Sequence, residues 1–287
     1  MEKKDYIEIW DKILTKFKIS SFVYDIGDNL RKFHLYKFLK IVFKNCPNND
    51  IPLTIYDFGA GNWLYLDKIY KAIGENCLQR NVQLSGFDFS RAALEWGSCK
   101  YKNLKPKNVE TILIPGDFVK ALNSIEPDST DMIFSLEVTE HLEDDEKFLS
   151  LTSKVLKEDG FLILSVPNSE PSFLSFDWFR YVFNHKKLIE KDIRVGHYRR
   201  YTTNKLHMML NKVGFTTLKT EYYDFFWGDL IEFFLTQCFK RDSIFKKIFF
   251  YFCLPIIWLE DYVLNFLKVK RSGGIFILAQ KTKSLDI

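Results

Sequence analysis

Residues 137–141 read Glu-Val-Thr-Glu-His and place two carboxylates and an imidazole within a short stretch of chain. Side chains three and four residues apart share a face when the backbone is helical. Together, Glu137, Glu140 and His141 form a ligand set suited to a divalent cation such as magnesium, manganese or iron. His141 could instead act alone as a general base, or the two glutamates could merely cap and solvate a turn. The residues by themselves leave these three interpretations open.

A second chemical signal is the glycine-rich turn that follows an apolar run at residues 53–61, Leu-Thr-Ile-Tyr-Asp-Phe-Gly-Ala-Gly. A buried strand that breaks into such a turn brings bare backbone N–H groups close to a ligand. The acid at the strand end, Asp57, can anchor a cation or an ordered water. A nicotinamide fingerprint would need a third glycine where Leu64 stands, and no phosphate-loop lysine follows. The turn therefore predicts a nucleoside ligand without a pyrophosphate.

The elements that must position these residues follow a regular alternation. Short apolar strands alternate with amphipathic helices, which predicts an α/β fold with a Rossmann-like, mostly parallel sheet of seven strands and helices on both faces. The expected strands are 53–58, 82–88, 109–115, 131–136, 160–166, 215–223 and 274–281. The expected helices are 62–76, 90–100, 117–124, 144–157 and 202–213, with further helices in 4–46 and 225–269.

Acidic residues end or follow several of these strands, where open parallel sheets bind ligands. Asp88 ends the second expected strand and could accept hydrogen bonds from both ribose hydroxyls of a nucleoside. Asp117 follows the third strand and could accept from an exocyclic adenine amine, with Phe118 beside the ring. The fourth strand leads directly into Glu137. One edge of the sheet therefore collects both the nucleoside signals and the Glu-His cluster.

Composition narrows the class of protein. The chain has 287 residues, of which 47% are hydrophobic and 27% charged, and its net charge of +4 is too small to argue for a nucleic-acid partner. Five scattered cysteines show no metal-binding spacing, which predicts reduced thiols and a cytoplasmic location. The longest apolar run, 248–259, is interrupted by Pro255 and falls short of the about 20 residues that a membrane span needs.

These motifs, in this order, resemble those of the class I S-adenosylmethionine (SAM)-dependent methyltransferases over roughly residues 50–222. The matching segments are Asp57-Phe-Gly-Ala-Gly61, Gly86-Phe-Asp-Phe-Ser90, Gly116-Asp117, Asp131-Met-Ile-Phe-Ser-Leu-Glu-Val-Thr-Glu-His141, Leu156-Lys-Glu-Asp-Gly160 and Ser165-Val-Pro-Asn168. One departure is Trp63, which stands where the family often has a third glycine. Its ring could crowd the loop or form a wall of the cofactor pocket.

The resemblance implies that SAM is the cofactor and suggests which residues hold it. Asp57 and the glycine loop would hold the methionine end, Asp88 the ribose, and Asp117 with Phe118 the adenine. The full set of expected cofactor-binding residues is Asp57, Phe58, Gly59, Ala60, Gly61, Asp88, Phe89, Ser90, Asp117, Phe118 and Leu136.

The Glu-Val-x-Glu-His spacing is also similar to that of the ubiquinone-pathway O-methyltransferases and the small-RNA 2′-O-methyltransferases. In both groups the carboxylates and the histidine hold a metal that binds the acceptor's oxygens, and the RNA enzymes add a later histidine, here His197. The resemblance implies His141, Glu137 and His197 as catalytic residues. It further implies a magnesium or manganese site made of Glu137, Glu140, His141 and His197.

The expected activity is methyl transfer from SAM to an oxygen of a small or lipid-linked acceptor. Nitrogen and carbon acceptors stay open, because the cofactor half of such folds does not determine the nucleophile. The alternatives are a catalytically silent SAM-binding subunit and an RNA 2′-O-methyltransferase, although nucleic acid is the less expected partner. An anionic acceptor is suggested by a basic group before the sixth strand, namely Lys186, Lys187, Arg194, Arg199 and Arg200.

The chain divides into an N-terminal helical segment at 1–50, a SAM-binding core at 51–224, a helical acceptor or lid insertion at 225–270, and the last strand with its tail at 271–287. Aromatic residues and lysines in 225–269 could attach the protein peripherally to the inner face of a membrane. His34 and His185 show no evident partner and are expected to be structural, and His207 is expected on the surface. The oligomeric state stays open.

Overall fold

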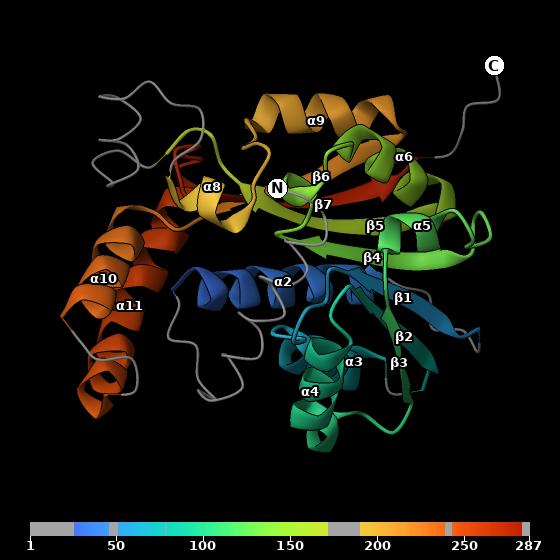
Figure 1. Ribbon diagram of the computed structural model, residues 1–287, viewed down its shortest axis with the longest axis horizontal. Helices are drawn as coiled ribbons and strands as arrows, with labels where there is room; N and C mark the ends of the chain where they lie inside the picture. The colour runs from blue at the N-terminus through green and yellow to red at the C-terminus, as the bar shows by residue number, and fades with distance from the viewer. Residues whose placement is uncertain (1–25, 46–50, 78, 172–189, 239–242, 283–287) are drawn as a thin grey trace.

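The computed structural model describes residues 26–45, 51–77, 79–171, 190–238 and 243–282 (Figure 1). Its centre is one sheet of seven strands, in the order β3-β2-β1-β4-β5-β7-β6. The strands are β1 (Leu53–Phe58), β2 (Val82–Asp88), β3 (Val109–Pro115), β4 (Thr130–Leu136), β5 (Leu156–Pro167), β6 (Phe215–Tyr223) and β7 (Gly274–Lys281). Strand β7 runs antiparallel to both of its neighbours, and the pairs among β1 to β5 are parallel. The predicted fold class is confirmed.

Helices cover both faces of the sheet, and each face has its own hydrophobic cluster. The α-helices are α2 (Ile26–Asn45), α3 (Leu66–Asn76), α4 (Arg91–Tyr101), α5 (Phe118–Leu122), α6 (Asp145–Val155), α8 (Glu190–Val195), α9 (Thr203–Lys212), α10 (Phe226–Gln237) and α11 (Ile244–Phe266). Helices α2, α3, α4, α10 and α11 contribute to one cluster, and α5, α6 and α9 to the other. Two short 3₁₀ turns, η2 (Lys102–Leu104) and η3 (Thr139–His141), complete the described elements.

The structure corrects two predicted helix boundaries. Helix α3 begins at Leu66 rather than at residue 62, because Trp63 adopts a left-handed backbone conformation with φ of 54° that a helix cannot contain. Helix α6 ends at Val155 rather than at residue 157, because Leu156 already pairs with Thr130 of β4. Within the described residues the first helix begins at Ile26, and the predicted helical residues 4–25 and 46 lie outside them.

Trp63 packs into the core below the glycine loop rather than lining the cofactor pocket. Its side chain is 1% exposed and belongs to the hydrophobic cluster on the α3 and α4 face. The indole lies against Gly86 of β2, and a methyl group at Gly86 would stand 2.1 Å from Trp63 Cζ2. Gly97 of α4 also leaves room here, since a methyl group there would stand 2.3 Å from the Asn62 carbonyl oxygen and 2.8 Å from Trp63 Cβ. The large residue at a family glycine position is thus accommodated by two glycines elsewhere.

Gly86→Ala is therefore expected to destabilise the protein by about 1–3 kcal/mol, because the new methyl group overpacks a buried ring. Urea unfolding followed by circular dichroism measures the loss. Gly74→Ala is the matched control: a methyl group there would stand 3.7 Å from Pro106 Cγ, an ordinary contact, and alanine suits the interior of α3. Equal stability of the Gly86→Ala variant and the wild type would show that the indole is not seated on Gly86.

Helix α11 contradicts the prediction that no segment is long enough to cross a membrane. It continues through Pro255 for 23 residues, and by length and composition it could span a bilayer. Only 28% of its most apolar stretch is buried. Helices α10 and α11 lie together at one side of the molecule, beside the N-terminal end of α2 (Figure 1).

Candidate active site

The glycine turn after β1 is shaped by its backbone. Gly59 and Gly61 have positive φ values of 75° and 52°, which glycine adopts without strain. A methyl group at Gly59 would stand 2.3 Å from Val138 Cγ2, so a larger residue does not fit there. The Gly61 backbone N–H donates to Asp88 Oδ2 over 2.9 Å, and the Ser90 N–H donates to Asp88 Oδ1 over 2.9 Å. Asp88 thus ties the ends of β1 and β2 together at the expected ribose site.

Asp57 is an unusual carboxyl group because it is buried, with only 5% of its surface exposed. Burial, with a smaller contribution from the negative charge of Asp88, raises the pKa of Asp57 to about 8. The two neighbouring acids therefore favour a positively charged ligand group beside them. An ammonium or sulfonium of a cofactor would supply that charge.

The expected adenine residues, Asp117 and Phe118, follow β3. Asp117 caps α5, since its Oδ1 accepts hydrogen bonds from the Val119 and Lys120 N–H groups. Phe118 is only 4% exposed and packs among other rings, while Phe89, whose ring centroid lies 5.7 Å from that of Phe118, is half-buried. Phe89 therefore offers more surface to a stacked base than Phe118 does. The other expected cofactor residues, Phe58, Ala60, Ser90 and Leu136, are buried around the strand ends.

Glu137 does not join the other residues of its motif. It lies just before the η3 turn with a positive φ of 58°, so the helical spacing with Glu140 and His141 does not apply. Its Oε1 accepts hydrogen bonds from Ser165 Oγ (2.5 Å) and Tyr223 OH (2.7 Å). Its Oε2 lies 3.1 Å from Arg31 Nη1.

The charge state of Glu137 follows from these contacts. Burial alone would raise the pKa of Glu137, but Arg31 and the hydrogen bonds from Ser165 and Tyr223 lower it. Arg31 comes from α2 and also donates through Nε to Tyr65 OH over 2.9 Å. The ionised Glu137 therefore fastens α2 to the carboxyl ends of β4, β5 and β6.

Glu140, His141 and His197 form a compact cluster whose ligand atoms all lie within 4.8 Å of one another. Glu140 Oε1 is 4.0 Å from His141 Nε2 and 3.8 Å from His197 Nε2. Glu140 is fully buried, and neither of its carboxylate oxygens has a hydrogen-bond partner among the described residues. A buried carboxylate in that condition is costly unless a ligand or cation satisfies it. The cluster contains three of the four expected metal ligands and excludes Glu137.

The protonation states fit a mostly buried site in which several titratable groups lie close together. Burial, together with the charge of Glu137, raises the pKa of Glu140 well above its usual range. Burial and the neighbouring His197 lower the pKa of His141 to about 4, so its imidazole is neutral at physiological pH. A neutral imidazole is the form that binds a metal.

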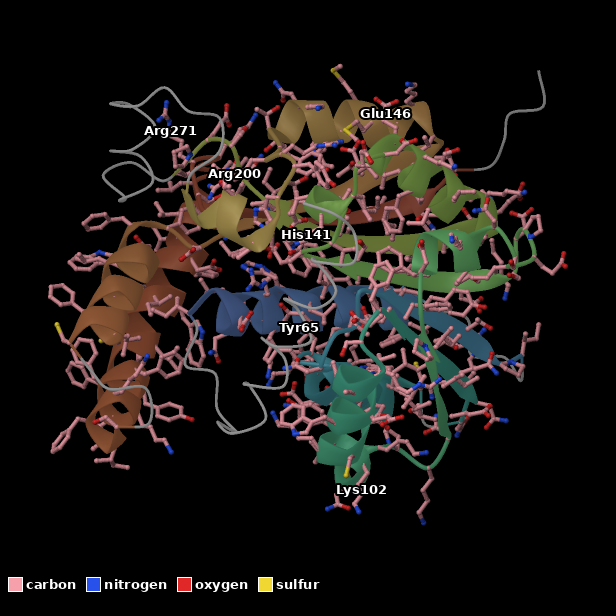
Figure 2. The ribbon with its side chains drawn as sticks, viewed as in Figure 1. Tyr65, Lys102, His141, Glu146, Arg200 and Arg271 are labelled. Atoms are coloured by element: carbon pink, nitrogen blue, oxygen red, sulfur yellow. The ribbon has the colours of Figure 1, made fainter. Side chains whose placement is uncertain are left out.

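A second layer of charged residues orients His197. Its Nδ1 lies 2.8 Å from Oδ1 of Asp192, which is 1% exposed, and Arg200 Nε donates to the other oxygen of Asp192 over 2.8 Å. A carboxylate behind a histidine holds the ring so that its other nitrogen, here Nε2, faces the ligand site. Figure 2 shows His141 near the middle of the molecule and Arg200 on the segment that follows α8. This segment also binds the η3 turn directly, because the Tyr198 N–H donates to the Glu140 carbonyl over 2.8 Å.

The basic group that suggested an anionic acceptor is largely engaged inside the protein. Arg199 Nη1 lies 2.5 Å from Asp145 Oδ1, and Arg200 binds Asp192. Lys186 and Lys187 lie outside the described residues, as does the side chain of Arg194. The two described arginines therefore hold the loop in place rather than present free charge.

Sequence reasoning missed the residues that support the site from other elements. Arg31, Tyr65, Tyr223 and Asp192 carry no motif, and only Ser165 belongs to a segment that the family resemblance quoted. The expected structural role of His34 agrees with its full burial, and the structure supplies partners that the sequence did not reveal. Its Nδ1 lies 2.7 Å from Glu221 Oε2 and its Nε2 lies 3.1 Å from Asp261 Oδ1. His185 lies outside the described residues, and His207 is half-buried with its Nε2 2.9 Å from Thr220 Oγ1.

Comparisons with known proteins agree with this fold. A family model described as a methyltransferase domain matches residues 31–220. No curated protein sequence matches the chain. Among solved structures, a methyltransferase-like protein from Bacillus halodurans is similar with a TM-score of 0.53 at 16% identity, covering 86% of this chain and 99% of the other. A protein described as a sarcosine dimethylglycine methyltransferase from Galdieria sulphuraria is similar with a TM-score of 0.54 at 12% identity, covering 87% of this chain and 86% of the other.

A third similar structure is phosphoethanolamine N-methyltransferase 2 from Haemonchus contortus in complex with SAM, with a TM-score of 0.52 at 18% identity, covering 85% of this chain and 52% of the other. At these identities the structures show a shared fold. The family match covers most of the chain and includes the glycine turn and the Glu-His cluster. The chain therefore belongs to the methyltransferase domain family and is a class I SAM-dependent methyltransferase.

Proposed function

We propose that this methyltransferase acts on an oxygen of a small or lipid-linked acceptor, with Glu140, His141 and His197 holding a divalent metal beside the reacting atoms. The observation that carries the proposal is the fully buried Glu140 carboxylate, which has no hydrogen-bond partner among the described residues and faces two imidazoles. Methyl transfer to the nitrogen of an unprotonated amine needs no such group, because its lone pair is already nucleophilic. Transfer to a hydroxyl benefits from a group that helps to remove a proton.

The residues around the glycine turn suit SAM in shape and charge. The backbone at Gly59 and Gly61 leaves the turn open to a close approach, and Asp57 and Asp88 complement a cationic methionine end. Asp88 and Asp117 then provide acceptors at the expected ribose and adenine positions. The similar Haemonchus contortus enzyme was solved with SAM, which supports the same cofactor here.

The donor set of the Glu-His cluster fits a metal better than it fits an isolated base. Two imidazoles and one carboxylate suit manganese, iron or zinc, and without Glu137 the set is less typical of magnesium. When bound, such a cation would lower the pKa of an acceptor hydroxyl. Asp192 would hold His197 in its ligating orientation, and the burial of Glu140 keeps competing water away. His141 alone would be a weak base, because its pKa of about 4 lies far below neutral pH.

The proposed acceptor chemistry is tested by product analysis. The protein is incubated with isotopically labelled SAM and either phenolic or lipid extracts, and the labelled product is examined by mass spectrometry. A methyl ether product supports the proposal. A labelled N-methyl product would contradict it and would align this chain with the N-methyltransferase among its structural neighbours.

Cofactor binding is expected to release a proton from Asp57. In the free protein the pKa of Asp57 is about 8, so the carboxyl is mostly protonated at neutral pH. A cationic cofactor favours the carboxylate, so affinity should rise with pH up to about 8 and should be about tenfold weaker at pH 6 than at pH 7. Calorimetry in buffers of different ionisation enthalpy counts the protons released.

The matched variant is Asp57→Asn, which cannot titrate and should bind SAM with little pH dependence in this range. Proton release that is equal in the wild type and in this variant would show that another group is responsible. Asp88→Asn serves as a second comparison, because it removes the neighbouring negative charge without removing the titrating residue.

A further inference from the structure

The outer face of α11 is apolar along its whole length. At positions three and four residues apart, it presents large hydrophobic side chains that are between 39% and 76% exposed. These residues, called here the α11 outer face, are Ile244, Phe245, Ile248, Phe252, Ile256, Leu259, Tyr262, Val263 and Phe266. A helix of 23 residues is about 35 Å long, so this face forms one long stripe.

The polar residues of α11 are on its other sides, which reverses the usual arrangement of a surface helix. Asp261 is 2% exposed and binds His34, and Lys246 is 9% exposed. Glu260 accepts a hydrogen bond from the Trp227 N–H of α10 over 3.0 Å. The remaining charged residue of the helix, Lys247, lies on its flank, and the α11 outer face contains no charged residue.

Such a stripe is unusual on a soluble protein, which rarely exposes a large contiguous apolar patch without a function for it. Trp227 and Phe234 of α10 and Tyr251 and Trp258 of α11 add four exposed aromatic side chains. Figure 2 shows side chains standing out from the outer side of the α10–α11 pair, away from the sheet. Tryptophan and tyrosine favour the boundary between lipid tails and water.

Basic residues lie beside the C-terminal end of this stripe. Lys268, Lys270 and Arg271 follow α11 directly and are exposed. Lys268 and Lys270 line a cavity of about 650 Å³ between α11 and β6, together with Tyr262 and Phe266 of the α11 outer face. Lysine and arginine at the edge of an apolar surface complement anionic lipid headgroups.

We infer that the α11 outer face lies flat in the surface of an anionic lipid bilayer, with Lys268, Lys270 and Arg271 on the headgroups. The helix does not cross the bilayer, because its inner face is fixed to the core through Phe250, Ile257 and the Asp261–His34 contact. Surrounding that face with lipid would leave a buried acid and imidazole in hydrocarbon. This inference goes beyond the proposed function and does not depend on the acceptor.

Co-sedimentation of the full chain with lipid vesicles tests the inference. Vesicles of phosphatidylcholine alone are compared with vesicles that also contain phosphatidylglycerol. The wild type should sediment with the anionic vesicles, and the double variant Phe252→Glu/Leu259→Glu should reduce the bound fraction at least tenfold. Met208→Glu on α9 is the matched control, because Met208 is 69% exposed and lies off the α11 outer face.

A second variant, Lys270→Glu/Arg271→Glu, should remove the preference for anionic vesicles, with binding weakened about tenfold. SAM affinity measured on every variant shows that each one is folded. Failure of the wild type to sediment with either vesicle would overturn the inference. It would also be overturned if the wild type were a dimer that Phe252→Glu/Leu259→Glu converts to monomers, since a second copy would then cover the face. If the wild type did not bind SAM, that result would instead count against the proposed function and leave the membrane inference standing.

Discussion

Glu140→Gln is expected to lower kcat by at least about 100-fold while leaving SAM affinity nearly unchanged. The carboxylate is fully buried between His141 and His197, and an amide of the same shape cannot supply its charge to a metal. The expected cofactor residues Asp57, Asp88 and Asp117 lie at or after the ends of β1, β2 and β3, whereas Glu140 lies in η3 after β4. Steady-state kinetics and calorimetry with SAM separate the two quantities. Glu146→Gln is the matched control, because Glu146 is exposed on α6 and forms an ion pair with Lys212 far from the Glu-His cluster.

Metal content distinguishes two interpretations of the cluster of Glu140, His141 and His197, namely a metal site and a general base. Protein purified without chelator should carry a transition metal in elemental analysis, and His197→Ala should lose it. Asp192→Asn should weaken metal affinity by about 10–100-fold without removing a ligand, because it only frees the ring of His197. A wild type that contains no metal and keeps full activity in chelator would reject the metal proposal.

His34→Ala is expected to destabilise the protein by about 3–5 kcal/mol, because it leaves buried acids without their shared cation. The imidazole is fully buried between Glu221 and Asp261, which come from β6 and α11. Burial alone would lower the pKa of His34, but hydrogen bonds to Asp261 and Glu221, and their charges, raise it. Urea unfolding measures the loss. His207→Ala, which removes one half-buried hydrogen bond, is the control and should cost about 1 kcal/mol.

The stability lost in His34→Ala depends on pH with a definite sign. The folded pKa of His34 lies above its unfolded value of about 6.5, so its stabilisation is complete below that pH and decreases as pH rises through the folded value. Burial opposes ionisation of Glu221, but His34 and Lys37 lower the pKa of Glu221 to about 2. The stabilisation that ionised Glu221 gives the fold is therefore present above about pH 4.5 and lost as pH falls toward 2.

The difference in the free energy of unfolding between wild type and His34→Ala should consequently be largest between about pH 4.5 and 6.5. A difference that grows as pH rises above 7 would contradict the charged state assigned to His34. His34 and Arg31 both belong to α2. Arg31 contacts Glu137 and holds α2 to the site, and His34 holds α2 to β6 and α11. A destabilised α2 should therefore also impair turnover.

Much of the fold follows from local patterns. Five of the seven strands, β1, β2, β3, β6 and β7, agree with their predicted limits to the residue, because apolar runs bounded by turn residues determine where a buried strand can exist. The helix limits were less predictable at Trp63 and Leu156. The left-handed backbone of Trp63 delays the start of α3, and the pairing of Leu156 with Thr130 ends α6. Neither event has a local signal in the chain.

By itself, the sequence determined the order of strands and helices, the glycine turn with its acids, and the presence of Glu140, His141 and His197 as ligand-type residues. Only the tertiary structure decided that His197 joins Glu140 and His141 while Glu137 turns to Arg31, Ser165 and Tyr223. It also decided that the apolar face of α11 points outward. The physical reason is that local spacing sets which residues can share a face. Partners from distant segments, such as Asp261 for His34, determine which face is buried and which charges meet.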